Sequence, residues 1–137
     1  MGDAVYEVGT AAGVRAFHVM PGMEGPEGEL HAHDYRIDLV VRRDELSPEG
    51  WVCDLDVLDA ALREITQRLE GSDLDAIRPE EAEAVTVEVF ARWVHDTLSA
   101  PVARAGGETL AVRVWESPVA FGGFAGPVAY EPAASSP

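Results

Sequence analysis

Residues 30–43 alternate between apolar and polar side chains over most of their length. Alternation with a period of two is typical of a strand that has one buried face. The face expected to be buried carries His31, His33, Tyr35, Ile37, Leu39 and Val41. The sequence therefore predicts a long, half-buried strand in this segment.

A second strand-like run spans residues 6–20, and one of its faces carries Val14, Ala16, His18 and Met20. The small residues between positions 9 and 13 predict a bend or bulge within this run. Residues 21–28 are rich in proline and glycine, so they are expected to form the loop between the two strands.

The apolar spacing changes to three and four residues after Asp54. This spacing predicts an amphipathic helix that begins after an Asp54 N-cap and ends near residues 70–71. A second helix is expected to begin after a Thr86 N-cap and to end before a loop at residues 101–107. The second helix contains His95, which we expect to lie on its surface.

Alternation returns at residues 110–116, and a turn at residues 118–123 would lead into a last strand at residues 124–130. The resulting order is strand, strand, helix, helix, strand, strand. This order predicts an α+β domain, in which a four-stranded antiparallel sheet carries two helices on one face. We expect a single domain over residues 1–132 and a disordered tail at residues 133–137.

The net charge of the chain disfavours some classes of binding partner. Its 137 residues include 10 basic and 25 acidic side chains, for a formal net charge of −15. Such a charge disfavours binding to nucleic acid and to anionic membranes, because phosphate groups would be repelled. A phosphorylated small molecule stays possible, since it needs only a local cluster of cations.

Other features of composition point to a cytoplasmic protein. No apolar run approaches the ~18 residues of a membrane span, and the first residues do not resemble a signal peptide. The single cysteine, Cys53, excludes an internal disulfide framework and is expected to be a small buried residue.

The histidines supply the candidate chemistry. His31 and His33 would project side by side from one strand, and His18 lies on the neighbouring predicted strand. Three imidazoles leave one coordination position open, which suits a catalytic zinc rather than a closed structural site. The alternative is a set of partly buried histidines without a metal.

Several motifs occur in a characteristic order along the chain. They are His18, then His31-Ala32-His33-Asp34-Tyr35, Gly50-Trp51-Val52-Cys53-Asp54-Leu55-Asp56-Val57-Leu58, Val85-Thr86-Val87-Glu88-Val89-Phe90-Ala91-Arg92-Trp93 and Val114-Trp115-Glu116-Ser117-Pro118. With these motifs the chain resembles the 6-pyruvoyl-tetrahydropterin synthase / 6-carboxytetrahydropterin synthase family over roughly residues 5–130. The resemblance implies the tunnelling fold (T-fold), in which the sheets of a homotrimer or homohexamer join into a barrel with active sites between subunits.

The resemblance also implies the roles of the site residues. His18, His31 and His33 would hold zinc, which acts as a Lewis acid on the side chain of 7,8-dihydroneopterin triphosphate. Glu116 would bind the ring nitrogens of the pterin through two parallel hydrogen bonds.

Two positions depart from the family pattern. Glu27 stands where the family has its catalytic cysteine, and Gly71 stands where the family has a histidine after the first helix. A carboxylate beside zinc can act as a general base, so Glu27 is the predicted catalytic base, with Glu29 as the alternative if the loop is shifted.

Three functions are consistent with these residues. The first is a zinc-dependent lyase, similar to 6-pyruvoyl- or 6-carboxytetrahydropterin synthase, that acts on 7,8-dihydroneopterin triphosphate or a related pterin with an altered base. The second is a catalytically impaired subunit that binds zinc and pterin on the same scaffold. The third is a metal-binding protein that has no pterin ligand.

Overall fold

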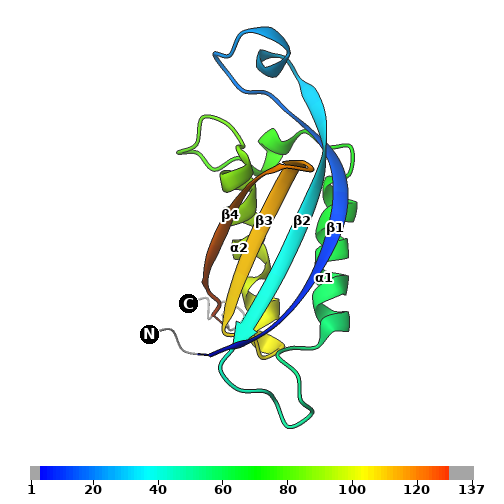
Figure 1. Ribbon diagram of the computed structural model, residues 1–137. Helices are drawn as coiled ribbons and strands as arrows, with labels where there is room; N and C mark the ends of the chain where they lie inside the picture. The colour runs from blue at the N-terminus through cyan, green and yellow to red at the C-terminus, as the bar shows by residue number, and fades with distance from the viewer. Residues whose placement is uncertain (1–3, 130–137) are drawn as a thin grey trace, which may run out of the picture.

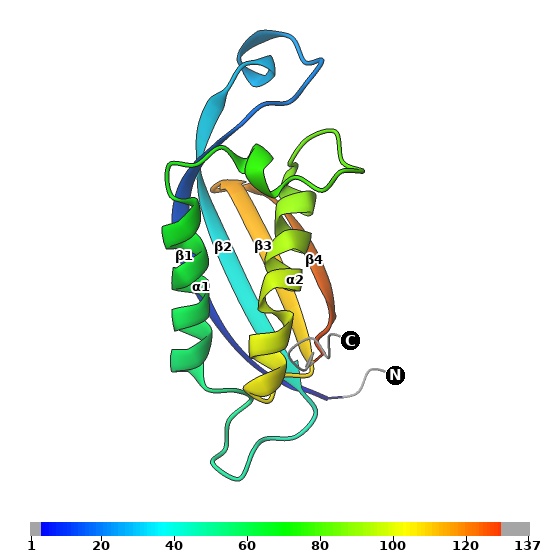
Figure 2. The same cartoon turned by 180° about the vertical axis from the view of Figure 1, so that it is seen from behind.

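The computed structural model describes residues 4–129, so the predicted tail at residues 133–137 lies outside it. The elements in chain order are β1 (Tyr6–His18), η1 (Gly25–Gly28), β2 (His31–Arg43), α1 (Leu55–Leu69), η2 (Leu74–Ile77), α2 (Val87–Arg104), β3 (Thr109–Ser117) and β4 (Ala120–Pro127). The strands form one antiparallel sheet in the order β1-β2-β3-β4, and both α-helices cover the same face (Figures 1 and 2). The predicted α+β architecture is confirmed.

The β1–β2 hairpin is the longest pairing in the sheet and projects beyond the ends of β3 and β4 (Figure 1). Its register runs without interruption from Tyr6 opposite Arg43 to His18 opposite His31. No bulge interrupts this register, so the predicted bulge is wrong. Gly9 instead permits close approach, because a Cβ atom there would lie 2.5 Å from the carbonyl oxygen of Leu39.

The two helices follow the predicted capping. The Asp54 carboxylate accepts a hydrogen bond from the Asp56 N–H at 2.9 Å, and the Thr86 hydroxyl accepts one from the Val89 N–H at 3.1 Å. In Figure 2, α1 lies over β1 and β2, and α2 lies over β3 and β4. The buried core between helices and sheet includes Ile37, Leu39, Leu62, Phe90, Val94, Leu110 and Val112. Within residues 4–129, no helix is both long and apolar enough to cross a membrane.

Two element boundaries differ from the prediction. Helix α2 continues through Pro101 to Arg104, because Val102, only 2% exposed, packs into the core and holds the last turn. Strand β4 begins at Ala120, so Gly122 and Gly123 are strand residues rather than turn residues. A Cβ atom at Gly123 would lie 2.6 Å from a β3 carbonyl oxygen, and one at Gly122 would lie 2.6 Å from a helix side chain.

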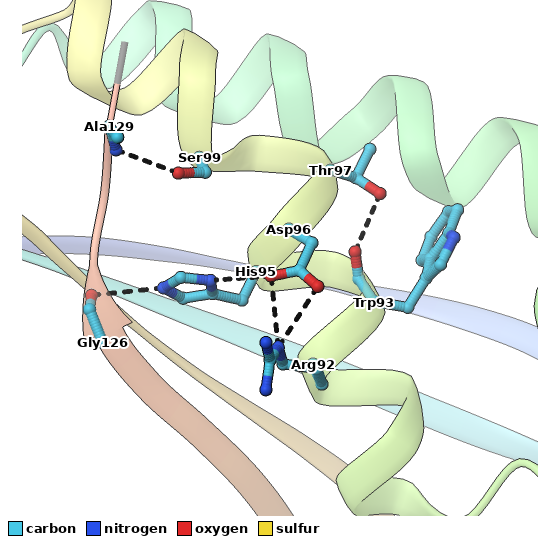
Figure 3. A network of polar contacts seen from close by, with 8 residues as sticks. All are labelled: Arg92, Trp93, His95, Asp96, Thr97, Ser99, Gly126 and Ala129. Carbon is cyan, nitrogen blue, oxygen red and sulfur yellow. Dashed lines mark hydrogen bonds and ion pairs between the residues drawn. The ribbon is translucent and has the colours of Figure 1, made fainter. Parts of the chain in front are cut away.

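The prediction that His95 lies on the surface is also wrong. Its side chain is 5% exposed and lies between α2 and β4, where Nε2 is 3.2 Å from the Gly126 carbonyl oxygen (Figure 3). The other ring nitrogen, Nδ1, is 3.4 Å from the carboxylate of Asp96, which also pairs with Arg92. The imidazole meets the ring of Phe124 edge-on, so His95 ties an edge strand to the helix beneath it.

Candidate metal centre and ligand pocket

The three predicted ligand residues come together at one end of the sheet. His18 ends β1 and pairs directly with His31, the first residue of β2, while His33 follows two residues later on the same face. The His18 ring centroid lies 4.5 Å from that of His31 and 5.1 Å from that of His33. One ligand nitrogen from each histidine lies within 4.8 Å of the other two, which is a spacing that could hold a metal ion.

Backbone carbonyl groups fix the orientation of two of these rings. The Nδ1 atom of His18 is 3.1 Å from the Val85 carbonyl oxygen, and that of His31 is 2.8 Å from the Glu29 carbonyl oxygen. Because a carbonyl only accepts, each Nδ1 must carry the proton and donate it. In the neutral imidazole, each Nε2 is then a bare lone pair, which is the arrangement of a metal-ligating histidine with its supporting hydrogen bond.

The Nε2 atoms themselves fit a metal. His18 Nε2 is buried and has no hydrogen-bond partner among the described residues, and this costs about 1–3 kcal/mol if nothing binds it. The Nε2 atoms of His31 and His33 lie 3.1 Å apart. Two nitrogens at about 2.05 Å from a tetrahedral zinc would lie roughly 3.3 Å apart, so this pair is close to zinc geometry.

The electrostatic surroundings favour the neutral, ligating form of His33. Burial lowers the pKa of His33 below its ordinary value, and the neighbouring His18 and His31 lower it further. The charges of Glu116 and Glu27 oppose this shift, so both carboxylates act on the imidazole. Burial also raises the pKa of the adjacent Tyr35 hydroxyl, with Glu116 adding to the effect.

A pocket of about 270 Å³ joins the histidines to the predicted carboxylates. It is lined by His18, Met20, Met23, Glu27, His31, His33, Thr86, Val87, Glu88 and Glu116. Among the described residues, Glu29 does not line this pocket, and Asp73 lines a separate pocket beside His18. The structure thus places Glu27, rather than Glu29, in the same cavity as the histidines.

Sequence reasoning did not assign five of the lining residues to the site: Met20, Met23, Thr86, Val87 and Glu88. Met23 comes from the glycine-rich loop, whose path no periodicity predicts, whereas the alternation at residues 14–20 had already grouped Met20 with His18. Thr86 and Glu88 were visible in the motif at residues 85–93, but Thr86 was interpreted only as a helix cap. The signal that could have found them is their position at the N-terminus of α2, which lies at the same end of the sheet as the histidines.

Glu70 and Gly71, at the position where the family has a histidine after the first helix, have a structural role in this chain. Gly71 follows the C-cap of α1 in a left-handed conformation, with φ of 72°, and its N–H donates to the Arg15 carbonyl oxygen at 2.7 Å. The Glu70 carboxylate accepts a hydrogen bond from the Arg15 N–H at 3.1 Å. Both residues attach the end of α1 to β1, and neither lines the histidine pocket.

Cys53 lies elsewhere and does not substitute for the family's cysteine. It is 5% exposed, as expected for a small buried residue, and it borders a groove with Tyr6, Trp51 and Leu55. Burial raises the pKa of the Cys53 thiol, and the nearby Asp54 charge adds to this shift. A thiol held protonated is a poor nucleophile and a poor base.

Comparison with known proteins identifies one family for this chain. The family model for 6-pyruvoyl tetrahydropterin synthase matches residues 8–126, whereas a search of curated protein sequences finds no match. The 6-pyruvoyl tetrahydropterin synthase of Plasmodium falciparum is 15% identical, with a TM-score of 0.72 over 92% of this chain and 100% of that chain.

Two further solved structures share the fold. A catalytic-residue mutant of the Plasmodium vivax 6-pyruvoyltetrahydropterin synthase, with cysteine in place of a glutamate, is 15% identical, with a TM-score of 0.70 over 92% of this chain and 100% of that chain. The Caenorhabditis elegans 6-pyruvoyl tetrahydropterin synthase is 16% identical, with a TM-score of 0.69 over 90% of this chain and 97% of that chain. At these identities the likeness shows the shared T-fold.

Proposed function

Because this chain belongs to the 6-pyruvoyl tetrahydropterin synthase family, we propose that it is a zinc-dependent lyase that acts on 7,8-dihydroneopterin triphosphate or a related pterin. The observation that carries the proposal is one pocket that contains three convergent histidines together with Glu27 and Glu116. Each part of this pocket suits one task in the chemistry of a reduced pterin.

His18, His31 and His33 would hold the zinc through their Nε2 atoms. When bound, the zinc supplies a Lewis acid that polarises hydroxyl groups of the substrate side chain. The carbonyl groups of Val85 and Glu29 hold two of the rings in the ligating tautomer. These hydrogen bonds exist without the metal, so little reorganisation would be needed to form the site.

Glu116 would orient the heterocycle. It lies near the end of β3 and lines the histidine pocket, and its charge affects the pKa values of His33 and Tyr35. A carboxylate accepts two parallel hydrogen bonds from the amino and ring N–H groups of an aminopyrimidine edge. The closeness of Glu116 to the histidines supports a pterin-binding protein over one that binds only a metal.

Glu27 would be the general base. It lines the pocket from the loop that precedes β2, together with the three histidines. In this role a carboxylate oxygen of Glu27 would accept a proton from the substrate side chain. The Plasmodium vivax relative, whose catalytic-residue mutant replaces a glutamate, supports glutamate in a catalytic role on this fold.

A second candidate function is a catalytically impaired subunit that binds zinc and pterin. The observation in its favour is the engagement of Glu70 and Gly71 in contacts with β1, which leaves no proton relay at the position of the family's histidine. Acid–base groups typically contribute about 10²–10⁴-fold each to a rate, so turnover weaker than that of a complete site is expected. Zinc and pterin binding would be retained.

The test measures product formation by the zinc-loaded protein from 7,8-dihydroneopterin triphosphate and from 7,8-dihydroneopterin. We expect weak turnover that Glu27→Gln lowers by at least about 100-fold while pterin binding persists. Glu24→Gln is the matched control, since Glu24 is an exposed glutamate of the same loop and lies outside the pocket lining. Turnover unchanged by Glu27→Gln would exclude Glu27 as the base, and binding without any turnover would favour the impaired subunit.

A further inference from the structure

The sheet face that the helices leave uncovered, seen in Figure 1, differs in charge from the rest of the chain. The side chains that alternate with the buried ones along each strand project from this face. Among the described strand residues, its charged side chains are four arginines and three acids: Arg15, Arg36, Arg42, Arg113, Glu7, Asp34 and Asp38. Cations thus slightly outnumber carboxylates on this face, in a chain whose formal net charge is −15.

A cavity of about 790 Å³ on this side of the sheet adjoins the histidine pocket. Arg15, Arg36 and Ser117 line the cavity together with His33 and Glu116, which also line the histidine pocket. The two spaces therefore share a wall. A ligand whose ring is bound by Glu116 would have two guanidinium groups in the adjoining cavity.

Arg36 is held in this cavity by one edge of its guanidinium group. Its Nε atom donates to one oxygen of Asp38 at 2.7 Å, and the Trp115 indole N–H donates to the other oxygen at 2.8 Å. Among the described residues, the two Nη groups of Arg36 have no hydrogen-bond or ion-pair partner, and the side chain is 66% exposed. Opposite Arg36 on β1 is Gly13, which has no side chain to cover it. The Nη groups are therefore available to an anion.

Arg15 lies diagonally across the β1–β2 pairing from Arg36. It is opposite Asp34, which precedes Arg36 by two residues, and diagonal neighbours of this kind are roughly 7–8 Å apart. Its Nη1 atom pairs with Asp34 at 3.0 Å, and both side chains are exposed. An ion pair this exposed contributes little to stability, so a phosphate group can replace the carboxylate at little cost. Two long cationic side chains thus flank a space that a chain of phosphate groups could occupy.

We propose that Arg36 and Arg15 form an anion subsite that binds the phosphate groups of a phosphorylated pterin, while Glu116 binds its ring. The inference rests on the proposed function, because it concerns the substrate of the same site. The Nη groups of Arg36 would donate to phosphate oxygens, a contact that suits the planar guanidinium group. Glu27 and Glu88 line the histidine pocket but not this cavity, so the phosphate groups would lie away from these two carboxylates.

The experiment compares two equilibrium titrations of the assembled, zinc-loaded full chain, so that any residues from a second copy are present. One ligand is 7,8-dihydroneopterin triphosphate and the other is unphosphorylated 7,8-dihydroneopterin. Arg36→Ala should weaken binding of the triphosphate at least about tenfold and leave binding of 7,8-dihydroneopterin unchanged, because only the phosphate groups contact the guanidinium group. The effect of Arg36→Ala should shrink at high salt, since salt screens attraction between charges.

Two further variants sharpen the comparison. Arg15→Ala, at the second arginine of the subsite, should likewise weaken binding of the triphosphate alone. Arg63→Ala is the matched control, because Arg63 is also 66% exposed and forms one ion pair, with Asp59 at 2.7 Å, but lies on α1 outside the cavity. It should leave both affinities unchanged.

A third titration, with inorganic tripolyphosphate, separates the inference from the proposed function. If neither pterin binds, but tripolyphosphate binds and Arg36→Ala weakens it at least about tenfold, the anion subsite stands and the proposed function fails. If both pterins bind and Arg36→Ala affects them equally or affects neither, the inference is overturned and the pterin function stands. Absence of binding by the triphosphate and by tripolyphosphate would overturn the inference as well.

Discussion

Zinc should stabilise the wild-type protein against heat, and the replacement His31→Ala should remove most of this effect. His31 is the most suitable ligand to change because it is only partly buried, so its loss disturbs packing less than the loss of His18, which is 5% exposed. Its single supporting hydrogen bond, from Nδ1 to the Glu29 carbonyl oxygen, lies in a loop. The variant should therefore fold while it lacks one of three ligands.

The size of the effect follows from binding linkage. At a free zinc concentration 100-fold above the dissociation constant, binding to the folded state alone adds about 2.7 kcal/mol to the free energy of unfolding. For a chain of this length that corresponds to a rise in melting temperature of roughly 10 °C. If His31→Ala weakens zinc binding about 100-fold, the same zinc concentration adds only about 0.4 kcal/mol, or roughly 2 °C.

The assay is thermal unfolding, followed by circular dichroism, with chelator and then with graded zinc. Glu29→Gln is the control, because only the backbone carbonyl of Glu29 contacts His31 and the substitution preserves it. Its zinc-induced shift should equal that of the wild type. An identical shift in His31→Ala, or no shift in the wild type at any zinc concentration, would refute the three-histidine site.

Three further outcomes are expected. Light scattering should give a mass three or six times that of the 14.7 kDa chain, because the outer edge of β4 and most of that of β1 would otherwise be unpaired; a mass of one chain would contradict the barrel. Gly71→Ala should lower the free energy of unfolding by about 1 kcal/mol, because its φ of 72° disfavours a side chain, whereas Gly13→Ala, with ordinary φ and only a 3.6 Å contact, should cost less. His95→Ala should cost about 2 kcal/mol in denaturant unfolding, since it removes the contact between the imidazole and the Gly126 carbonyl oxygen and empties a buried site; a cost near zero would contradict its bridging role.

The sheet and the histidine cluster could be predicted because both depend on local periodicity. Strand alternation fixes which side chains share a face, so His31 and His33 had to project together with Tyr35 and Ile37. The helix caps at Asp54 and Thr86 were likewise visible, since a side-chain oxygen at an N-cap satisfies a nearby N–H.

The incorrect predictions involve residues whose local preference is overridden by packing. Pro101 normally ends a helix, yet burial of the next residue, Val102, maintains the last turn. Gly122 and Gly123 are typical of turns, but here they let β4 approach α2 and β3 closely. His95 lies on a helix whose partner strand is distant in sequence, so no local pattern could reveal its contact with Gly126.

The site was only partly predictable for the same reason. Glu27 and Glu29 are two residues apart in a loop, and only the three-dimensional path of the loop decides which one faces the histidines. Glu88 lines the pocket from the first turn of α2, and its place beside the histidines becomes visible only when the helix is packed on the sheet. The sequence therefore predicted the histidine cluster, while the tertiary structure was needed to identify the residues of the pocket around it.

The central claim is that His18, His31 and His33 hold a zinc ion beside a pterin oriented by Glu116. Its most direct test is a crystal structure of the zinc-loaded protein grown with 7,8-dihydroneopterin, with anomalous diffraction recorded at the zinc edge. We predict about one zinc per chain, with three imidazole nitrogens at about 2.0–2.1 Å, and the aminopyrimidine edge hydrogen-bonded to the Glu116 carboxylate. Zinc bound elsewhere, or a pterin held without Glu116, would contradict the account.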